Sequence, residues 1–121
     1  MTDTLAATAE IARQNDLFRR SILTTGRCPS LAGQACVTAS LAHRANLPQI
    51  MEAIATAGDE AFTPDIDPEG GHDFGRVEID GERIWFKIDY YSDANCAWGS
   101  DDPSNPAQTF RLLTVLLPSD W

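Results

Sequence analysis

The chain has 121 residues, of which 43% are hydrophobic, and a formal net charge of −9 from 18 acidic and 9 basic side chains. This size and composition predict a single domain over residues 1–121, in which residues 1–10 could form a flexible N-terminal extension. No apolar stretch approaches the roughly 18 residues that span a bilayer, and no basic segment followed by an apolar run opens the chain. A cytoplasmic protein without a membrane partner is therefore expected.

The negative charge is concentrated in residues 59–102, which hold thirteen acidic and three basic side chains. Such a segment repels a nucleic-acid backbone, so direct nucleic-acid binding is not expected, and it favours a protein partner with a basic surface. Solubility alone could also account for the acidity.

The three cysteines are Cys28, Cys36 and Cys96. Their odd number and the absence of CxxC spacing indicate neither a disulfide framework nor a zinc ribbon.

The first half of the chain predicts two helices and a strand. An amphipathic helix is expected from Thr4 or Thr8 to just before Gly26, followed by a strand over residues 34–41. Pro48 fits the first turn of a second helix, which Gly58 ends. Residues 59–71 have no periodicity and predict a long acidic loop, a kind of segment that often carries function.

Residues 67–91, DPEGGHDFGRVEIDGERIWFKIDYY, predict a hairpin around Asp80-Gly81, because this dipeptide suits a type I′ turn. Ile79 then lies opposite Glu82, and Val77, Ile84 and Phe86 are expected to be buried while Glu78 and Arg83 are exposed. The expected cross-strand pairs on the polar face are Glu78 with Arg83, Arg76 with Trp85, Phe74 with Lys87 and His72 with Asp89.

Residues 92–108 predict a second long polar loop, and residues 109–118 predict a strand that is covered on both faces. The fold expected from this order is α+β, with a mostly antiparallel sheet of about four strands and two helices packed on one face.

Several segments, in this order and spacing, resemble a family of small bacterial proteins, domain of unknown function 3768, over about residues 11–121. They are NDLFRR, DPEGGHDFG, WFKIDYY, GSDDP and TFRLLTVLLPSDW. The resemblance implies no established reaction, and it implies genes that are often carried on plasmids and prophages. Gly71 stands where the family usually has a glutamate, and Ser92 delays an expected aspartate to Asp93. The matching polar residues are His72, Asp73, Lys87, Asp89, Tyr90, Ser100 and Asp102.

The polar residues of the hairpin permit an enzymatic interpretation. His72 with Asp73 and Asp89 could act as a general acid and base, with Lys87 nearby, or hold a metal. The spacing matches no standard metal site, and no nucleophile elbow, P-loop or dinucleotide fingerprint is present, so no metal and no cofactor are expected. A structural hydrogen bond from His72 is the simpler interpretation.

The aromatic residues Tyr90, Tyr91, Trp85 and Trp98 are expected near one end of the sheet, where they could bind a partner or cover the core. The leading hypothesis is a small acidic inhibitor, of the anti-CRISPR or antirestriction type, that occupies a basic surface of a host defence or nucleic-acid-handling enzyme. A small hydrolase and a toxin–antitoxin or regulatory partner are the alternatives. The residues expected to bind the partner are Asp65, Asp67, Glu69, Trp85, Tyr91, Trp98, Asp101 and Asp102. The oligomeric state does not follow from the sequence.

Overall fold

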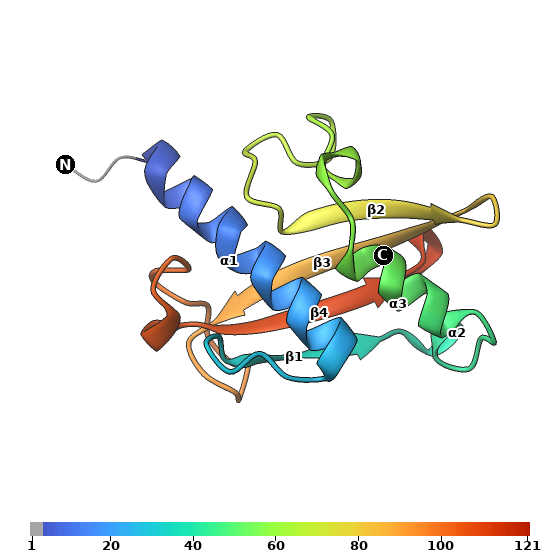
Figure 1. Ribbon diagram of the computed structural model, residues 1–121. Helices are drawn as coiled ribbons and strands as arrows, with labels where there is room; N and C mark the ends of the chain where they lie inside the picture. Colours follow the sequence, from blue (N-terminus) through green and yellow to red (C-terminus); the bar gives the residue numbers. More distant parts are fainter. Residues whose placement is uncertain (1–3) are drawn as a thin grey trace.

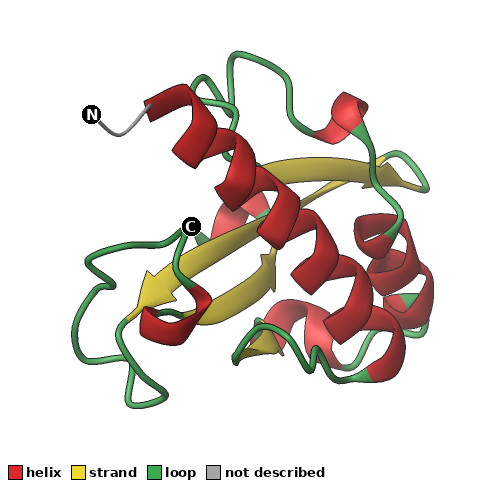
Figure 2. Cartoon of the chain, turned by 60° about the vertical axis from the view of Figure 1, so that its left-hand side comes forward, coloured by secondary structure: helices red, strands yellow, loops and turns green. Residues whose placement is uncertain are grey.

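The computed structural model describes residues 4–121 as a four-stranded sheet with its long helices on one face (Figures 1 and 2). The helices are α1 (Thr4–Thr25), α2 (Ala39–Ala42) and α3 (Leu47–Ala55), and the strands are β1 (Gly33–Val37), β2 (Phe74–Ile79), β3 (Glu82–Tyr91) and β4 (Phe110–Leu116). Short 3₁₀ turns follow at Asp59–Ala61, Pro106–Gln108 and Pro118–Asp120. The α+β prediction is confirmed.

The strands lie in the order β1-β4-β3-β2, so β1 and β2 are the two edges. β2 pairs with β3 and β3 with β4 in antiparallel fashion, whereas β1 and β4 are parallel. The predicted strand over residues 109–118 is thus an interior strand. Its inward residues Leu113 and Val115 are fully buried, and its outward residues Leu112 and Thr114 are half-buried.

The hairpin register is the one that the turn predicts. Ile79 pairs with Glu82 across Asp80 and Gly81, whose φ angles of 53° and 80° are those of a type I′ turn. Ile84 and Phe86 are fully buried, and Glu78 and Arg83 are exposed, as expected. Val77 is half-buried, because β2 has a neighbouring strand on one side only.

Two predicted boundaries differ from the structure. The strand over residues 34–41 ends at Val37, and the chain then turns into α2, which buries Leu41 completely. The hydroxyls of Thr38 and Ser40 donate to Asp120 Oδ2 at 2.8 and 2.6 Å, which holds this turn against the C-terminus. Within the proposed extension 1–10, residues 4–10 already belong to α1, and residues 1–3 lie outside the described residues.

The core lies between α1, α3 and the inner face of the sheet. Its fully buried members include Phe18, Ile50, Ile54, Ile84, Phe86 and Leu113. Within residues 4–121, no helix has both the length and the apolar character needed to cross a membrane.

Gly75 on β2 allows two aromatic rings of the core to pack close to the strand. A Cβ atom there would lie 2.4 Å from Phe86 Cζ and 2.8 Å from Phe62 Cε1. We predict that Gly75→Ala lowers the free energy of unfolding by about 2 kcal/mol, because two aromatic rings must shift. Gly99→Ala is the matched control, since its Cβ would meet nothing closer than 3.8 Å. Urea denaturation measures both, and equal midpoints for the two variants would contradict the packing argument.

Candidate functional site

Both long polar loops lie at the same end of the sheet, because β2 starts where β3 ends (Figure 1). The loop before β2, residues 62–73, and the loop after β3, residues 92–109, are both tied to α1. Asn15 Nδ2 donates to the carbonyl of Gly71 at 2.9 Å, and Gln14 Nε2 donates to the carbonyl of Ser104 at 2.7 Å. Two neighbouring residues of one helix therefore position both loops.

Arg111 on β4 is the centre of this arrangement, and it is fully buried. Its Nε donates to Asn15 Oδ1 at 2.8 Å, and its Nη2 donates to Gln14 Oε1 at 2.9 Å and to the carbonyl of Pro103 at 3.0 Å. The guanidinium also lies 5.4 Å from the centre of the Tyr90 ring. Burial lowers the pKa of Arg111, and its Nη1 has no hydrogen-bond partner among residues 4–121. The charge is thus held in place by helix amides and one carbonyl.

Asn15 also connects this cluster to the start of β2. Its Nδ2 lies 2.7 Å from the hydroxyl of Tyr90, which donates to Asp73 Oδ2 at 3.1 Å. Burial raises the pKa of Asp73, although the hydrogen bond from Tyr90 acts in the opposite direction. Burial, and after it the charge of Asp73, raises the pKa of Tyr90, so this hydroxyl remains protonated. The tyrosine is therefore a hydrogen-bond donor that holds two segments together.

His72 faces α1, and the predicted pairing with Asp89 is wrong. The hairpin ladder ends at Phe74 and Lys87, and the backbone of His72 has a φ of 58°, which turns its side chain away from Asp89. Its Nδ1 lies 2.9 Å from Asp16 Oδ1, and its ring stacks on Phe62 with centroids 4.0 Å apart. Asp16 also accepts from Arg19 Nη1 at 2.9 Å. The structural interpretation of His72 is thus the one that its contacts favour.

Arg19 is a second buried arginine, only 2% exposed, and it connects α1 to the end of α3. Its Nε and Nη2 donate to the carbonyls of Ile54 and Ala57 at 2.8 and 3.0 Å. These carbonyls lie at the C-terminal end of α3, where the helix dipole favours a positive charge. Burial lowers the pKa of Arg19, as it does for Arg111.

Asp73, Lys87 and Asp89, the other residues of the enzymatic interpretation, line a hollow of about 360 Å³ together with Phe74 and Trp121. Lys87 Nζ is 3.0 Å from Asp89 Oδ2, so these two charges form an ion pair. His72 does not line this hollow. Among residues 4–121, no three histidine, cysteine or acidic side chains come together as a metal site. His72 and the other residues of the hydrolase hypothesis therefore do not line one hollow.

The aromatic residues do not share one end of the sheet, contrary to the prediction. Trp85 pairs with Leu116 and Tyr91 with Phe110, at opposite ends of β4. Trp85 instead packs edge-to-face on Phe74 and Trp121, with centroids 5.4 and 6.1 Å apart. Trp98 lies in the loop after β3 and is 78% exposed. The structure thus separates an aromatic cluster on the outer sheet face from a single exposed tryptophan.

The predicted acidic residues also divide into two groups. Asp65, Glu69, Asp101 and Asp102 are exposed. Asp67 is only 7% exposed, because its Oδ2 accepts from the backbone N–H of His72 at 3.1 Å. Ser100 is half-buried, and its hydroxyl lies 2.8 Å from that of Thr109. Asp67 and Ser100 are therefore parts of the loop structure.

Sequence reasoning missed the residues that build this site from α1 and β4, namely Gln14, Asn15, Asp16, Arg19 and Arg111. A signal was present in the helix, where Asn15, Phe18, Arg19 and Ile22 follow the three- and four-residue spacing of one face. Another was the single arginine within the apolar run of residues 110–117. Polar residues at core positions indicate buried hydrogen-bond partners.

Comparison with known families gives one match, to a family described as "Protein of unknown function (DUF3768)", over residues 35–120. The chain belongs to this family. The match begins after α1, so Gln14, Asn15 and Arg19 lie outside it, and it is shorter than the resemblance over residues 11–121. Comparison with curated proteins and with solved structures gives no match.

Removal of the Arg111 charge tests whether this residue holds the DUF3768 fold together. Arg111→Met leaves Asn15 Oδ1, Gln14 Oε1 and the Pro103 carbonyl without their donor. We predict a loss of about 3 kcal/mol in the free energy of unfolding, because each buried acceptor without a partner costs about 1–3 kcal/mol. The control Arg20→Met, at an exposed position of α1, should change stability by less than about 0.5 kcal/mol. Equal effects from both variants would contradict this assignment.

The raised pKa of Asp73 predicts a pH dependence. A carboxyl whose folded pKa exceeds its unfolded pKa binds its proton more tightly when the protein is folded. Its contribution to stability therefore falls as the pH rises from the unfolded pKa through the folded pKa. Asp73→Asn carries no charge to bury, and its amide oxygen can still accept from Tyr90. We predict that the variant gains stability relative to the wild type between about pH 3 and about pH 7.

Asp65→Asn is the control for this pH dependence, because a hydrogen bond from Thr63 lowers the pKa of Asp65. The contribution of Asp65 to stability therefore rises with pH, so Asp65→Asn should lose stability relative to the wild type over the same range. Thermal unfolding across this pH range measures both variants. A stability difference between Asp73→Asn and the wild type that does not change with pH would contradict the prediction.

Proposed function

We propose that this protein binds a basic surface of a protein partner through its two acidic loops, with Trp98 as the central contact. Trp98 carries the proposal, because tryptophan is mostly buried in folded proteins and here it is 78% exposed, in a loop that also carries the exposed Asp93, Asp101 and Asp102. Exposed tryptophans within a charged rim are typical of binding hot spots.

The loop that presents Trp98 is held by backbone hydrogen bonds. The N–H of Ser92 donates to the carbonyl of Trp98 at 2.8 Å, and the N–H of Ser100 donates to the carbonyl of Tyr90 at 3.1 Å. Gly99 also bridges to Tyr91 at the end of β3. A loop held in this way loses little entropy when it binds, which favours affinity.

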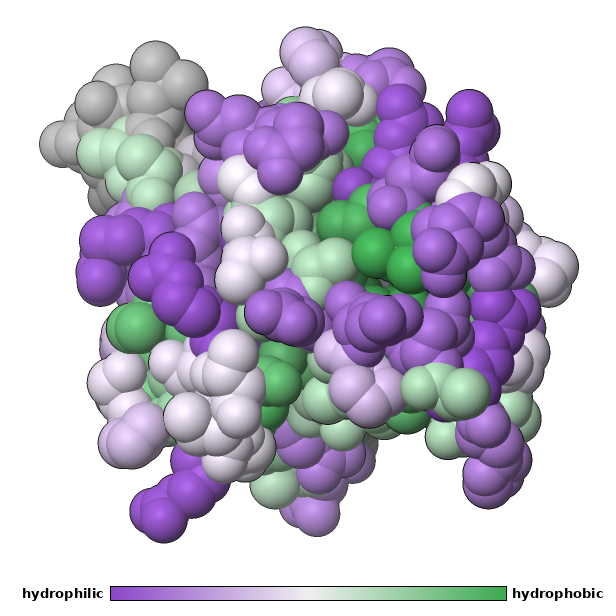
Figure 3. Space-filling model, turned by 45° about the vertical axis from the view of Figure 1, so that its right-hand side comes forward, coloured by the Kyte–Doolittle hydropathy of each residue, from purple (hydrophilic) through white to green (hydrophobic). Residues whose placement is uncertain are grey.

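The exposed carboxylates of the two loops supply the electrostatic part of the proposal. They are Asp65, Glu69, Asp93, Asp101 and Asp102. Within residues 4–121, only Asp65 of this group has an ion-pair partner, Arg76 at 3.8 Å. The face seen in Figure 3 is also mainly hydrophilic, with smaller hydrophobic patches between the polar residues. Charges that are not paired within the chain are free to attract a basic partner.

The more specific form of the proposal is an inhibitor of the anti-CRISPR or antirestriction type, which would occupy the nucleic-acid-binding surface of a host defence enzyme. Clustered carboxylates resemble the charge of a phosphate backbone, and nucleic-acid-binding surfaces are basic. The location of the family's genes on plasmids and prophages, which the resemblance implies, would fit this role.

The experiment begins with recovery of the host partner and measures binding kinetics at two salt concentrations. The triple variant Asp93→Asn, Asp101→Asn, Asp102→Asn should slow association and reduce its dependence on salt, because charge steers the encounter. Trp98→Ala should speed dissociation by an amount equivalent to about 2 kcal/mol. Duplex DNA should compete with the protein for an enzyme of the proposed type.

Trp121→Ala is the matched control, since Trp121 is 73% exposed but lies at the C-terminus against Phe74 and Trp85. It should leave the kinetics unchanged. Association that is indifferent to salt and to the three charge substitutions would refute the electrostatic proposal, and turnover of a small substrate without any partner would support an enzyme.

A further inference from the structure

β2 is an edge strand whose outer backbone groups have no partner strand. The N–H of Ile88 donates to the carbonyl of Asp73 at 2.8 Å, so in this antiparallel pair the odd-numbered residues of β2 point their N–H and C=O groups towards β3. The corresponding groups of Phe74, Arg76 and Glu78 point towards the open edge. No backbone hydrogen bond from another described segment reaches them.

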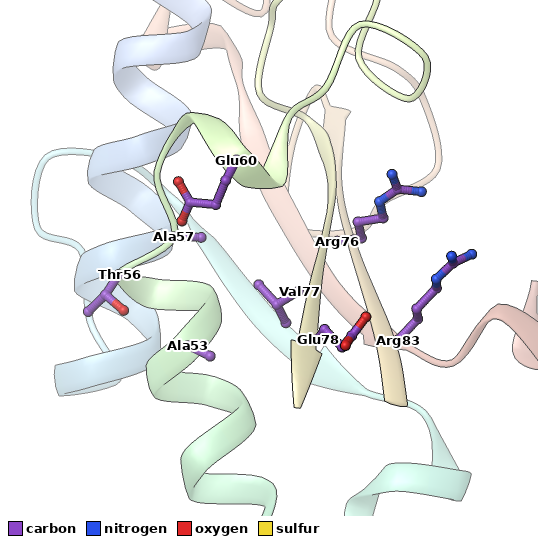
Figure 4. Close-up of a pocket in the computed structure, with 8 residues that line it drawn as sticks. All are labelled: Ala53, Thr56, Ala57, Glu60, Arg76, Val77, Glu78 and Arg83. Carbon is purple, nitrogen blue, oxygen red and sulfur yellow. The ribbon is translucent and has the colours of Figure 1, made fainter. Parts of the chain in front are cut away.

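A groove of about 490 Å³ runs beside this edge, between the end of α3 and β2. Its α3 side presents small side chains, Ala53, Thr56 and Ala57, and Val77 projects into it from the strand (Figure 4). Arg76 and Arg83 point to the other side of the sheet in the same view. The open edge thus has space for the side chains of an added strand on its helix side. On its other side it already carries charged side chains.

We propose that a second copy of this chain pairs with β2 in antiparallel fashion, with Val77 opposite Val77 of the second copy. In this register Arg76 lies opposite Glu78 of the second copy, and Glu78 lies opposite Arg76 of the second copy. Residues 76 and 78 are the ones whose N–H and C=O groups face the open edge, so both pairs form the two mutual hydrogen bonds of an antiparallel ladder. The two four-stranded sheets become one continuous sheet.

The charges of this strand are complementary to themselves under two-fold symmetry. Each of the two hydrogen-bonded pairs joins an arginine to a glutamate on the same face, and opposite charges directly across a ladder are stabilising. Within the chain these charges are weakly engaged. Arg76 lies 3.8 Å from Asp65, and Glu78 has no ion pair among residues 4–121. The second copy therefore supplies Glu78 with an ion-pair partner in addition to its cross-strand neighbour Arg83.

The helix side of the edge fits the same register. Gly75 lies opposite Ile79 of the second copy, so the largest apolar side chain on the helix side of the added strand lies opposite a residue without a side chain. The two Val77 side chains lie next to each other at the axis, beside the groove that Ala53 and Ala57 line. No shift by one residue preserves this match, because it would place Val77 opposite a charged residue.

Sedimentation equilibrium over a range of protein concentrations tests the proposal. The wild type should rise from the monomer mass of 13.2 kDa towards twice that mass. Arg76→Glu and Glu78→Arg should each weaken self-association at least about tenfold, because both symmetric pairs become repulsive. An equimolar mixture of these two variants should restore the dimer as a heterodimer, because each variant then complements the other.

Arg20→Glu is the matched control, since Arg20 is exposed on α1 and away from β2, and it should dimerise like the wild type. A wild type that keeps a mass of 13.2 kDa up to about 1 mM would overturn the proposal. A dimer that persists in both single variants would place the interface elsewhere and also overturn it. Circular dichroism checks that the single variants remain folded. Restoration of the dimer in the mixture also requires that both variants are folded.

Discussion

The hydrogen bonds of the buried Arg111 determine how the rest of this molecule is arranged. Its guanidinium joins β4 to Gln14 and Asn15 of α1, and these two amides in turn hold the carbonyls of Ser104 and Gly71. A buried charge with one donor unpartnered is costly. The sheet end nevertheless depends on it, because through Gln14 and Asn15 it connects both long loops to the same helix. An apolar residue at position 111 could fill the same space, but it could not bind both amides and the Pro103 carbonyl.

The need to fix the two long loops also explains why unusual polar residues at this end of the sheet have contacts within the fold. His72 has a left-handed backbone, which costs energy for a residue with a side chain. Three contacts offset this cost: Asp67 accepts from its backbone N–H, Asp16 contacts its Nδ1, and Phe62 stacks on its ring. Each contact comes from residues 62–73, the loop that holds His72, or from α1. The position of His72 is thus accounted for by contacts within the fold, whereas Trp98 and most of the loop carboxylates face solvent.

The hairpin could be predicted from sequence because its information is local. Asp80-Gly81 specifies the turn, and the turn specifies every pair from Ile79 and Glu82 to Phe74 and Lys87. The extension to His72 and Asp89 failed because the partner of His72, Asp16, lies 56 residues away in the chain. The burial of Asn15 and Arg19 also depends on distant carbonyls, those of Gly71 and Ile54. The parallel pairing of β1 with β4 was missed for a related reason, since no turn joins these strands and they lie far apart in the sequence.

The Trp98 loop and the open edge of β2 lie on different parts of the fold and can be used together. The Trp98 loop follows β3 at one end of the sheet, whereas the self-complementary charges lie along the open side of β2. Antiparallel pairing through β2 reverses the direction of the second sheet, so a dimer presents its two acidic loop pairs at opposite ends. Such a dimer can bind a partner with repeated basic surfaces through two contacts. The second contact then forms within the complex, at the high effective concentration that the first contact creates. A rigid, continuous eight-stranded sheet would keep the two loop pairs at a constant separation, so the symmetry of the partner would decide whether both can bind.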